Sequence, residues 1–200
     1  SESRFLHSIS KEQIIGFQEN WNRKRDHKQR IYLSYDFTNK NCQAGDIDLV
    51  EFGKAKDDKG LQVYNIAVAF DQNNRIPLFY EEYPGSITDI SQFVCTVDKI
   101  KDYGYKDMGF VLDRGYFSKE NIRYMDKCGY DFVIMMKGMK ALVMDLILEN
   151  KGKFEDARAN SIREFRVNGI TVKRRLFPSD AKDRYFHLFY SSGKYASERE

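Results

Sequence analysis

Hydrophobic residues at the start of the chain follow a helical spacing and then change to the pattern of a strand. The helical positions are Ile14, Phe17 and Trp21. Ser10 and Gln13 precede and enter this stripe with the spacing of a capping box, which predicts that a helix begins there. Apolar and aromatic residues then concentrate over Ile31–Asp36. We therefore expect an N-terminal helix and a basic connector over residues 1–30, followed by a first strand.

Two further strands are predicted after a polar connector rich in Gly, Asp and Lys. They cover Val63–Phe70 and Ile76–Tyr83, and Gln72-Asn73-Asn74 separates them. Asn tolerates the left-handed backbone of tight turns, so these residues predict a hairpin. With the first strand, this gives three antiparallel strands. Four aromatic side chains of the sheet region are expected in the core rather than on a base-stacking surface: Phe79, Tyr80, Tyr83 and Phe110.

The next segment has the pattern of helix, strand, helix and strand. Asp89 can cap the first of these helices, which Tyr103-Gly104 closes. Met108–Leu112 is nearly all apolar, as in a strand that is buried on both faces. Ser118 can then cap a second helix, and Gly129 can end it before a strand over Asp131–Met136. Two strands that are joined by a helix in this way run parallel.

Two of the predicted strands end on an aspartate. Asp36 closes the first strand, and Asp113 follows Leu112 at the end of the buried strand. If these two strands pair in parallel, both carboxylates meet at one edge of the sheet, where α/β proteins place their sites. Two such acids can hold divalent metal for phosphoryl transfer. No sequence rule establishes the pairing, and Asp is also common where a strand ends in a turn.

Residues 137–200 have a mixed pattern. Residues 141–149 suggest an amphipathic helix, and Asn168-Gly169 suggests a turn. Three strands are expected around that turn: Glu164–Val167, Thr171–Phe177 and Tyr185–Tyr190. The basic strand over Val172–Phe177 can be read as a DNA contact or as an edge strand that is protected by charge, and the second interpretation explains the residues sufficiently.

Composition narrows the class of protein. A hydrophobic fraction of 42% is enough for a core, while the net charge of +3 by itself decides nothing. Basic residues instead gather in two runs that suit phosphate contacts or a solvated surface: Arg23, Lys24, Arg25, Lys28 and Arg30, then Lys173, Arg174 and Arg175. The three cysteines, Cys42, Cys95 and Cys128, lack a paired spacing, so neither a disulfide framework nor a zinc site is expected.

The sequence lacks the signals of secreted, membrane-spanning and nucleotide-dependent proteins. There is no signal-peptide core, no apolar run of membrane length, no P-loop and no GxGxxG motif. His7, His27 and His187 do not form a constellation with a second ligand. Because the chain starts without Met and stops abruptly, we expect it to be a piece of a longer protein.

Four blocks, taken in order, resemble the catalytic core of a DDE-type insertion-sequence transposase, in the branch with an RNase H-like fold and a β-rich insertion after the second Asp. The first three blocks are Tyr35-Asp36-Phe37-Thr38, Phe52–Leu61, and Ile76-Pro77-Leu78 with Tyr83–Asp89. The fourth and most specific block is Leu112–Ser118 with Asn121. The resemblance covers Ile31–Met136, about half of the chain.

This resemblance implies an α/β fold: an RNase H-like mixed sheet over residues 31–136, with the start of an inserted β subdomain over residues 137–200. It implies DNA strand cleavage and strand transfer at insertion-sequence ends, with Asp36 and Asp113 as catalytic metal ligands for Mg²⁺, or alternatively Mn²⁺. The expected partners are transposon-end and target DNA, with a homodimer assembled on DNA and no membrane. The expected location is the bacterial cytoplasm, at the nucleoid when DNA is bound.

One departure from the family pattern stands out. The third acid, a Glu within a Tyr, Arg, Glu and Lys pattern on a later helix, has no match, and Glu198 and Glu200 are read as surface acids. This fragment alone is therefore expected to be inactive. Asp89 is left out of the site because a cap explains it, and Arg114 can contact either a phosphate or an acid. Two alternatives stay open: a catalytically silent RNase H-like DNA-binding remnant, and another RNase H-like nuclease.

Overall fold

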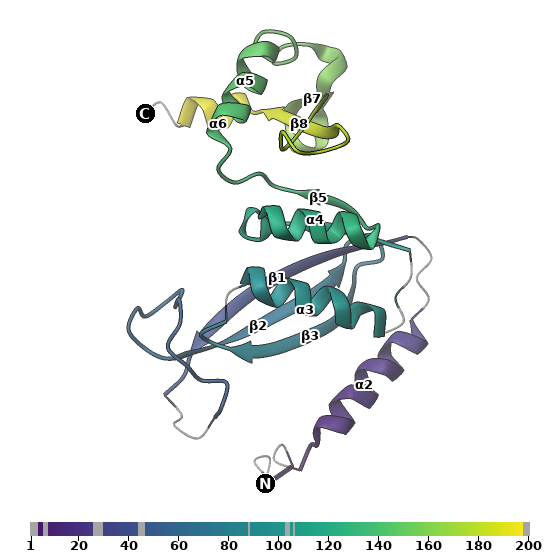
Figure 1. Cartoon of the computed structure of the whole chain (residues 1–200), viewed down its shortest axis with the longest axis vertical. Coiled ribbons are helices and arrows are strands. Elements are labelled where there is room, and N and C mark those ends of the chain that lie inside the picture. The colour runs from purple at the N-terminus through teal and green to yellow at the C-terminus, as the bar shows by residue number, and fades with distance from the viewer. Residues whose placement is uncertain are drawn as a thin grey trace. The chain divides into compact units, whose positions relative to one another are not determined.

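The chain folds into two compact units, Ser1–Lys137 and Gly138–Glu200 (Figure 1). The structure is a computed structural model that describes residues 4–5, 8–25, 30–43, 47–87, 89–102, 105 and 107–197. Within these residues, no helix is both long and apolar enough to cross a membrane. Cys42, Cys95 and Cys128 are not joined in disulfides in the part of the chain that the structure describes.

A five-stranded mixed sheet forms the centre of the first unit, and its strand order is β3-β2-β1-β4-β5. The strands are β1 (Ile31–Asn41), β2 (Val63–Asp71), β3 (Ile76–Pro84), β4 (Met108–Leu112) and β5 (Asp131–Ile134). β1, β2 and β3 are antiparallel neighbours, whereas β4 runs parallel to both β1 and β5. The predicted fold class, an RNase H-like mixed sheet, is confirmed.

Three helices accompany this sheet: α2 (Lys11–Lys24), α3 (Asp89–Asp102) and α4 (Lys119–Cys128). The capping box of Ser10 and Gln13 is present at the start of α2, and the Ser118 hydroxyl accepts the Asn121 N–H at the start of α4. Gly129 ends α4 with a left-handed φ of 73°. The Asp89 side chain lies outside the described atoms, as do Tyr103 and Gly104, so the cap and the end predicted for α3 stay predictions.

One face of the sheet is covered and the other is open. Helices α3 and α4 lie on the covered face (Figure 1), where the Phe93 ring of α3 packs 6.0 Å from Tyr35 and 5.8 Å from Phe110. Phe79, Tyr83 and Phe110 are buried as predicted. Tyr80 is not, since 39% of it is exposed. It follows the buried Phe79 in β3, and alternation along the strand turns it to the open face.

The predicted hairpin between β2 and β3 is confirmed, but its chemistry differs from the prediction. The left-handed residue is Arg75, with a φ of 55°, and not an asparagine. The buried carboxylate of Asp71 accepts the backbone N–H groups of Asn73 and Asn74 at 3.1 and 3.3 Å. The turn is therefore closed by a carboxylate at the end of β2, which holds both Asn residues in place.

In the described part of the second unit there are two α-helices, two short 3-10 helices and a three-stranded antiparallel sheet of order β6-β7-β8. Its elements are α5 (Lys140–Asn150), η2 (Arg158–Asn160), β6 (Ser161–Ile162), η3 (Arg163–Phe165), β7 (Val167–Arg174), β8 (Arg184–Tyr190) and α6 (Ser192–Ser197). The predicted helix over residues 141–149 is confirmed as α5. Its core includes Leu146, Phe154 and Phe186.

Two predictions for this unit were wrong. Glu164 lies in a 3-10 helix rather than a strand, because the left-handed Arg166, with a φ of 52°, interrupts the extended backbone. Asn168 and Gly169 lie inside β7 rather than in a turn. The Asn168 amide donates to the carbonyl groups of Phe154 and Glu155, so it anchors a neighbouring loop instead of closing a hairpin.

Candidate active site

The two predicted acids meet at the junction of β1 and β4. The parallel register of these strands ends with Tyr35 beside Leu112, so Asp36 and Asp113 are the next residue on each side. Both aspartates are exposed, whereas Tyr35 and Leu112 are buried on the covered face. The pairing that the sequence alone could not establish is therefore present, and the two carboxylates stand on neighbouring strands.

The sequence predicted that Asp36 ends its strand, and this prediction was wrong. β1 continues to Asn41 because β2 pairs with this segment, from Phe37 beside Ala67 to Asn41 beside Val63. Only the ladder between β1 and β4 stops at Tyr35. Asp36 thus has strand geometry on both sides, and its partner on β2 is Val68 on the open face.

Each carboxylate is oriented by the backbone that follows it. Oδ1 of Asp36 accepts the Phe37 N–H at 2.8 Å, and Oδ1 of Asp113 accepts the Arg114 N–H at 2.6 Å. Asp113 thereby caps the short helix η1 (Arg114–Tyr116). A Cβ on Gly115 would lie 4.0 Å from Oδ2 of Asp113, at ordinary van der Waals distance.

An aromatic cluster supports both acids from the covered face. The Tyr116 ring packs 5.6 Å from Tyr35 and 5.3 Å from Phe93, and Phe37 meets it edge-on at 6.4 Å. Tyr35 and Phe37 flank Asp36 in sequence, while Tyr116 lies three residues after Asp113. Packing of these rings therefore fixes the backbone of both acids together.

A buried polar network continues from this cluster. Oε2 of Glu81 accepts the Thr96 hydroxyl at 2.5 Å and the Gln92 amide at 3.1 Å, and Oε1 of Glu81 pairs with Lys99 at 2.9 Å. The Tyr35 hydroxyl is 2.8 Å from the Thr96 hydroxyl. This network joins β3, α3 and β1, so it ties the strand that carries Asp36 to the helix that covers it.

The connector after β1 brings a cation beside Phe37, the residue that follows Asp36. The buried Asn39 amide donates to the Lys54 carbonyl at 2.8 Å and accepts the Lys56 N–H at 3.0 Å. Nζ of Lys56 donates to the Phe37 carbonyl at 2.7 Å and lies 4.2 Å from the centre of the Phe37 ring. Sequence reasoning missed Lys56 because the Asn39 bonds that place residues 54–56 against β1 join residues 15 and 17 positions apart.

The first basic run is divided in the structure. Arg30 pairs with Asp107 at 3.2 Å and with Asp131 at 2.9 Å, and the hydrogen bond to Asp131 raises the pKa of Arg30. These residues precede or begin β1, β4 and β5, at the sheet edge opposite the two acids. Arg25 covers the Trp21 ring at 3.8 Å, and Lys28 lies outside the described residues. Arg30 therefore clamps strands at the end of the sheet away from the candidate site.

The residues present can contribute two carboxylates to a metal. No group of three His, Cys, Asp or Glu side chains that could hold an ion occurs among the described residues. Glu198 and Glu200 fall outside them. Mg²⁺ commonly takes one or two protein carboxylates and completes its shell with water and substrate phosphate, so the pair is chemically suited to a divalent ion that arrives with a phosphate.

Three solved structures of DNA-bound proteins are similar to this chain. The Mos1 transposase paired-end complex with left transposon end is 10% identical, with a TM-score of 0.38, over 74% of this chain and 57% of that one. The piggyBac transposase synaptic complex with hairpin DNA is 9% identical, with a TM-score of 0.41, over 80% and 32%. Endonuclease V from Ciona intestinalis with a 24mer DNA containing an inosine is 11% identical, with a TM-score of 0.32, over 89% and 82%.

Sequence comparison identifies the family. No curated protein matches the chain. This chain spans just over half of the Mos1 transposase chain and about a third of the piggyBac chain. Residues 26–191, however, match the family described as "Transposase DDE domain". That match covers most of the chain and includes both aspartates, β1 to β8 and the connector of Lys56. The chain belongs to the Transposase DDE domain family.

Proposed function

We propose that this chain is the catalytic-core portion of a DNA transposase that cleaves and transfers DNA strands at insertion-sequence ends. The observation that carries the proposal is the parallel pairing of β1 with β4, which makes Asp36 and Asp113 neighbours at one exposed edge. Members of the family use divalent metal ions. Here Asp36 and Asp113 would hold that ion, and we propose Mg²⁺, or alternatively Mn²⁺.

The chemistry follows from the positions of these side chains. A divalent ion at this edge would supply positive charge to the phosphate oxygens and to the attacking oxygen. The protein's part is to keep two carboxylates fixed, through the N–H groups of Phe37 and Arg114 and through the ring cluster below them. Lys56 offers a further positive charge beside Phe37, the residue after Asp36, that suits a DNA phosphate.

Several finer features belong to the same proposal. Residues 137–200 would be the start of an inserted β subdomain, and a third acid would come from another part of the whole protein. Assembly as a homodimer on DNA, and a bacterial, nucleoid-associated location, are expected from the family resemblance. A catalytically silent remnant that still binds DNA, or an RNase H-like nuclease without transposition, would share the same fold and the same two acids.

The test is a magnesium-dependent nicking assay on the full-length protein with the ends of its own element. Asp36→Asn and Asp113→Asn should each lower strand cleavage by at least about 100-fold, because even residues behind metal ligands cost 10- to 100-fold when changed. Asp57→Asn is the matched control, since Asp57 is an equally exposed acid on the connector.

The outcomes separate the candidates. Loss of cleavage in both variants, with an unchanged thermal unfolding midpoint and an active Asp57→Asn control, supports the proposal. Wild-type cleavage in either variant refutes the assignment of that acid. Cleavage without strand transfer favours the nuclease, whereas DNA binding without any cleavage favours the silent remnant.

A further inference from the structure

The second unit presents aromatic rings to solvent on one face of its sheet. Tyr185 and Phe189 of β8 are 64% and 63% exposed, while Phe186 between them is 8% exposed. Tyr185, His187 and Phe189 alternate with buried or half-buried positions, so all three lie on the same face of the strand. Large aromatic side chains on a soluble surface usually mark a contact with another molecule when they cluster.

The neighbouring strand completes this face. Gly169, Thr171 and Lys173 of β7 pair with Phe189, His187 and Tyr185 respectively. We call these six residues the aromatic sheet face. A Cβ on Gly169 would lie 3.0 Å from Cδ1 of Phe189, so the glycine makes room for that ring to cover β7. Thr171 and the Nδ1 atom of His187 are 2.8 Å apart, and this bond fixes the side chains between the two rings.

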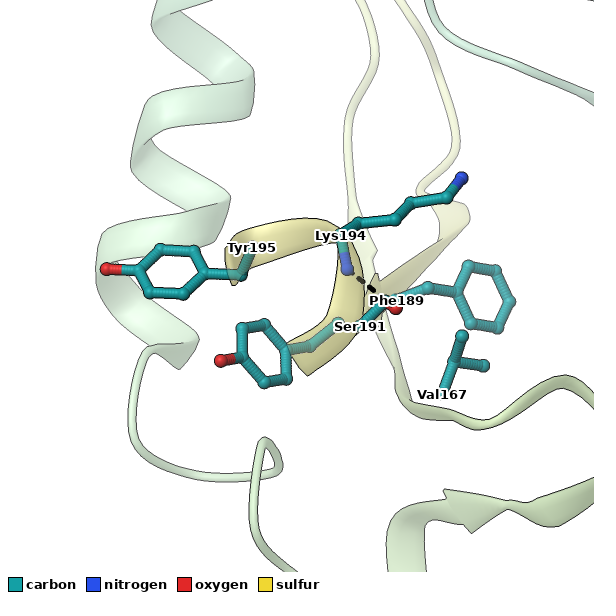
Figure 2. A pocket seen from close by; sticks show the side chains of 6 residues that line it. Val167, Phe189, Ser191, Lys194 and Tyr195 are labelled. Carbon is teal, nitrogen blue, oxygen red and sulfur yellow. Dashed lines mark hydrogen bonds between the residues drawn. The ribbon is translucent and has the colours of Figure 1, made fainter. Parts of the chain in front are cut away.

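Each exposed ring has a lysine beside it. Nζ of Lys173 lies 4.7 Å from the centre of the Tyr185 ring. At the other end, a pocket of about 290 Å³ is lined by Val167, Phe189 and Lys194, among others. Figure 2 shows the Lys194 side chain and the Phe189 ring on the same side of the strand end, while Tyr195 points to the other side. The face therefore alternates flat rings with positive charge.

Positive charge is also unevenly distributed along the sequence. Residues 138–200 contain 13 Lys and Arg against nine Asp and Glu, whereas residues 1–137 contain 20 against 21. Of the second basic run, Arg174 pairs with Glu149, and Arg175 lies 3.8 Å from Asp183. Lys173 instead accompanies the aromatic sheet face. The net positive charge of the second unit thus suits binding of a polyanion, and its exposed rings suit stacking against planar groups.

We propose that the aromatic sheet face binds unpaired nucleotides of DNA, with bases stacked on Tyr185 and Phe189 and phosphates near Lys173 and Lys194. Exposed rings between cations are the usual means by which proteins hold single strands. Tyr185 and Phe189 are four residues apart on β8, about 13.6 Å at about 3.4 Å per residue, or four times the rise of about 3.4 Å per nucleotide in duplex DNA. The two rings therefore suit bases that have been drawn apart, and not a stacked duplex. The choice of DNA rests on the proposed transposase function.

The experiment measures binding of the 200-residue chain to a short fluorescent oligonucleotide by anisotropy, in EDTA so that no cleavage occurs. The same sequence is offered as a single strand and as a duplex. Tyr185→Leu and Phe189→Leu should each weaken single-strand binding about tenfold, whereas Tyr185→Phe keeps it. Lys173→Gln should reduce the slope of log affinity against log salt by about 0.7. Phe5→Leu, which removes an exposed ring of the first unit, is the matched control.

The results distinguish three molecules that could bind the aromatic sheet face: single-stranded DNA, duplex DNA and a second copy of the chain. Preferential binding of the single strand that falls with both leucine variants, with unchanged circular dichroism, supports the inference. It is overturned if the leucine variants bind as wild type, or if single strand and duplex lose affinity equally. It is also overturned if the face instead mediates self-association, seen as a dimer that Tyr185→Leu dissociates without any effect on DNA. Asp36→Asn should bind the single strand normally, so failure of the proposed catalysis would be seen separately.

Discussion

Thr96 is a small side chain through which three elements are joined. Its hydroxyl donates to Glu81 of β3 and lies within hydrogen-bond distance of Tyr35 of β1, while its backbone belongs to α3. Burial makes these bonds consequential, because an ionised carboxylate in the interior needs each of its donors. The position of Asp36, next to Tyr35, depends on this arrangement.

Replacing Thr96 by Val keeps the shape of the side chain and removes its hydroxyl. We expect the free energy of unfolding to fall by about 2 kcal/mol, since Glu81 loses its shortest hydrogen bond in a buried setting. Urea denaturation at neutral pH measures the change. Thr38→Val, at an exposed position of β1, is the control and should alter stability by less than about 0.5 kcal/mol. Equal effects of the two changes would contradict the role given to Thr96.

Single residues were predictable from sequence where local chemistry determines them. The place of Asp36 and Asp113 beside the end of the β1–β4 ladder could be predicted because each follows an apolar run. Ser10 and Ser118 could be predicted because a cap needs only its next three residues. Lys56 and Thr96 could not be found in this way. Their partners are 15 to 61 positions away in the sequence, so their roles exist only after the sheet has formed.

At the scale of elements, two backbones come into close approach beside β2. A Cβ on Gly85 would lie 2.2 Å from the Val63 carbonyl oxygen and 2.6 Å from that of Glu51. A Cβ on Gly53 would lie 1.9 Å from the Gly85 carbonyl oxygen. The chain after β3 and the start of the connector can therefore pack together only because Gly85 and Gly53 have no side chains. This contact fixes the connector that carries Lys56.

Gly85→Ala should consequently destabilise the protein by more than about 2 kcal/mol, because the new methyl group meets backbone atoms that cannot move aside. Gly16→Ala is a suitable comparison. Gly16 lies within α2, and a Cβ added there would meet no atom within 4 Å, so alanine should stabilise the helix by about 0.5–1 kcal/mol. Thermal unfolding should show a lower midpoint for Gly85→Ala and a higher midpoint for Gly16→Ala. A Gly85→Ala protein as stable as wild type would disprove the close approach.

Elements were predicted well where a periodic pattern coincided with a clear start or stop. The strand Met108–Leu112 and the helix ended by Gly129 have the bounds that the sequence indicated. The errors arose where a side chain took a longer-range partner. Asn168 suggested a turn, but its amide binds a loop, and β1 runs past Asp36 because β2 supplies partners that no local pattern reveals.

At the scale of the molecule, the chain consists of two units with separate cores. Trp21, the single tryptophan, belongs to the first unit, where its indole N–H donates to the Pro77 carbonyl at 2.7 Å. Leu146 is 2% exposed in the core of the second unit. Indole fluorescence thus reports on one unit only, which allows the stability of each to be followed.

Leu146→Ala should lower the stability of the second unit by about 2–5 kcal/mol through loss of buried contacts. If the units unfold independently, the midpoint followed by tryptophan fluorescence stays unchanged, while far-ultraviolet circular dichroism shows an earlier transition. Leu33→Ala removes a fully buried side chain of β1 in the first unit. It should lower the midpoint followed by tryptophan fluorescence and leave the unfolding of the second unit unchanged. A shift of the fluorescence midpoint by Leu146→Ala would show that the two units unfold as one.

The continuation of β1 beyond Asp36 has a consequence for how the candidate site is lost on unfolding. A residue at a frayed strand end can lose its geometry through local opening, whereas one in the interior of a ladder moves only when the ladder breaks. Asp36 lies in the interior of the ladder, because β2 pairs with β1 on both sides of its position. Amide protons around it should exchange with solvent as slowly as those of the core. Under the proposed function, heat or denaturant should therefore abolish catalysis by the whole protein at the midpoint at which the first unit unfolds, with no earlier loss.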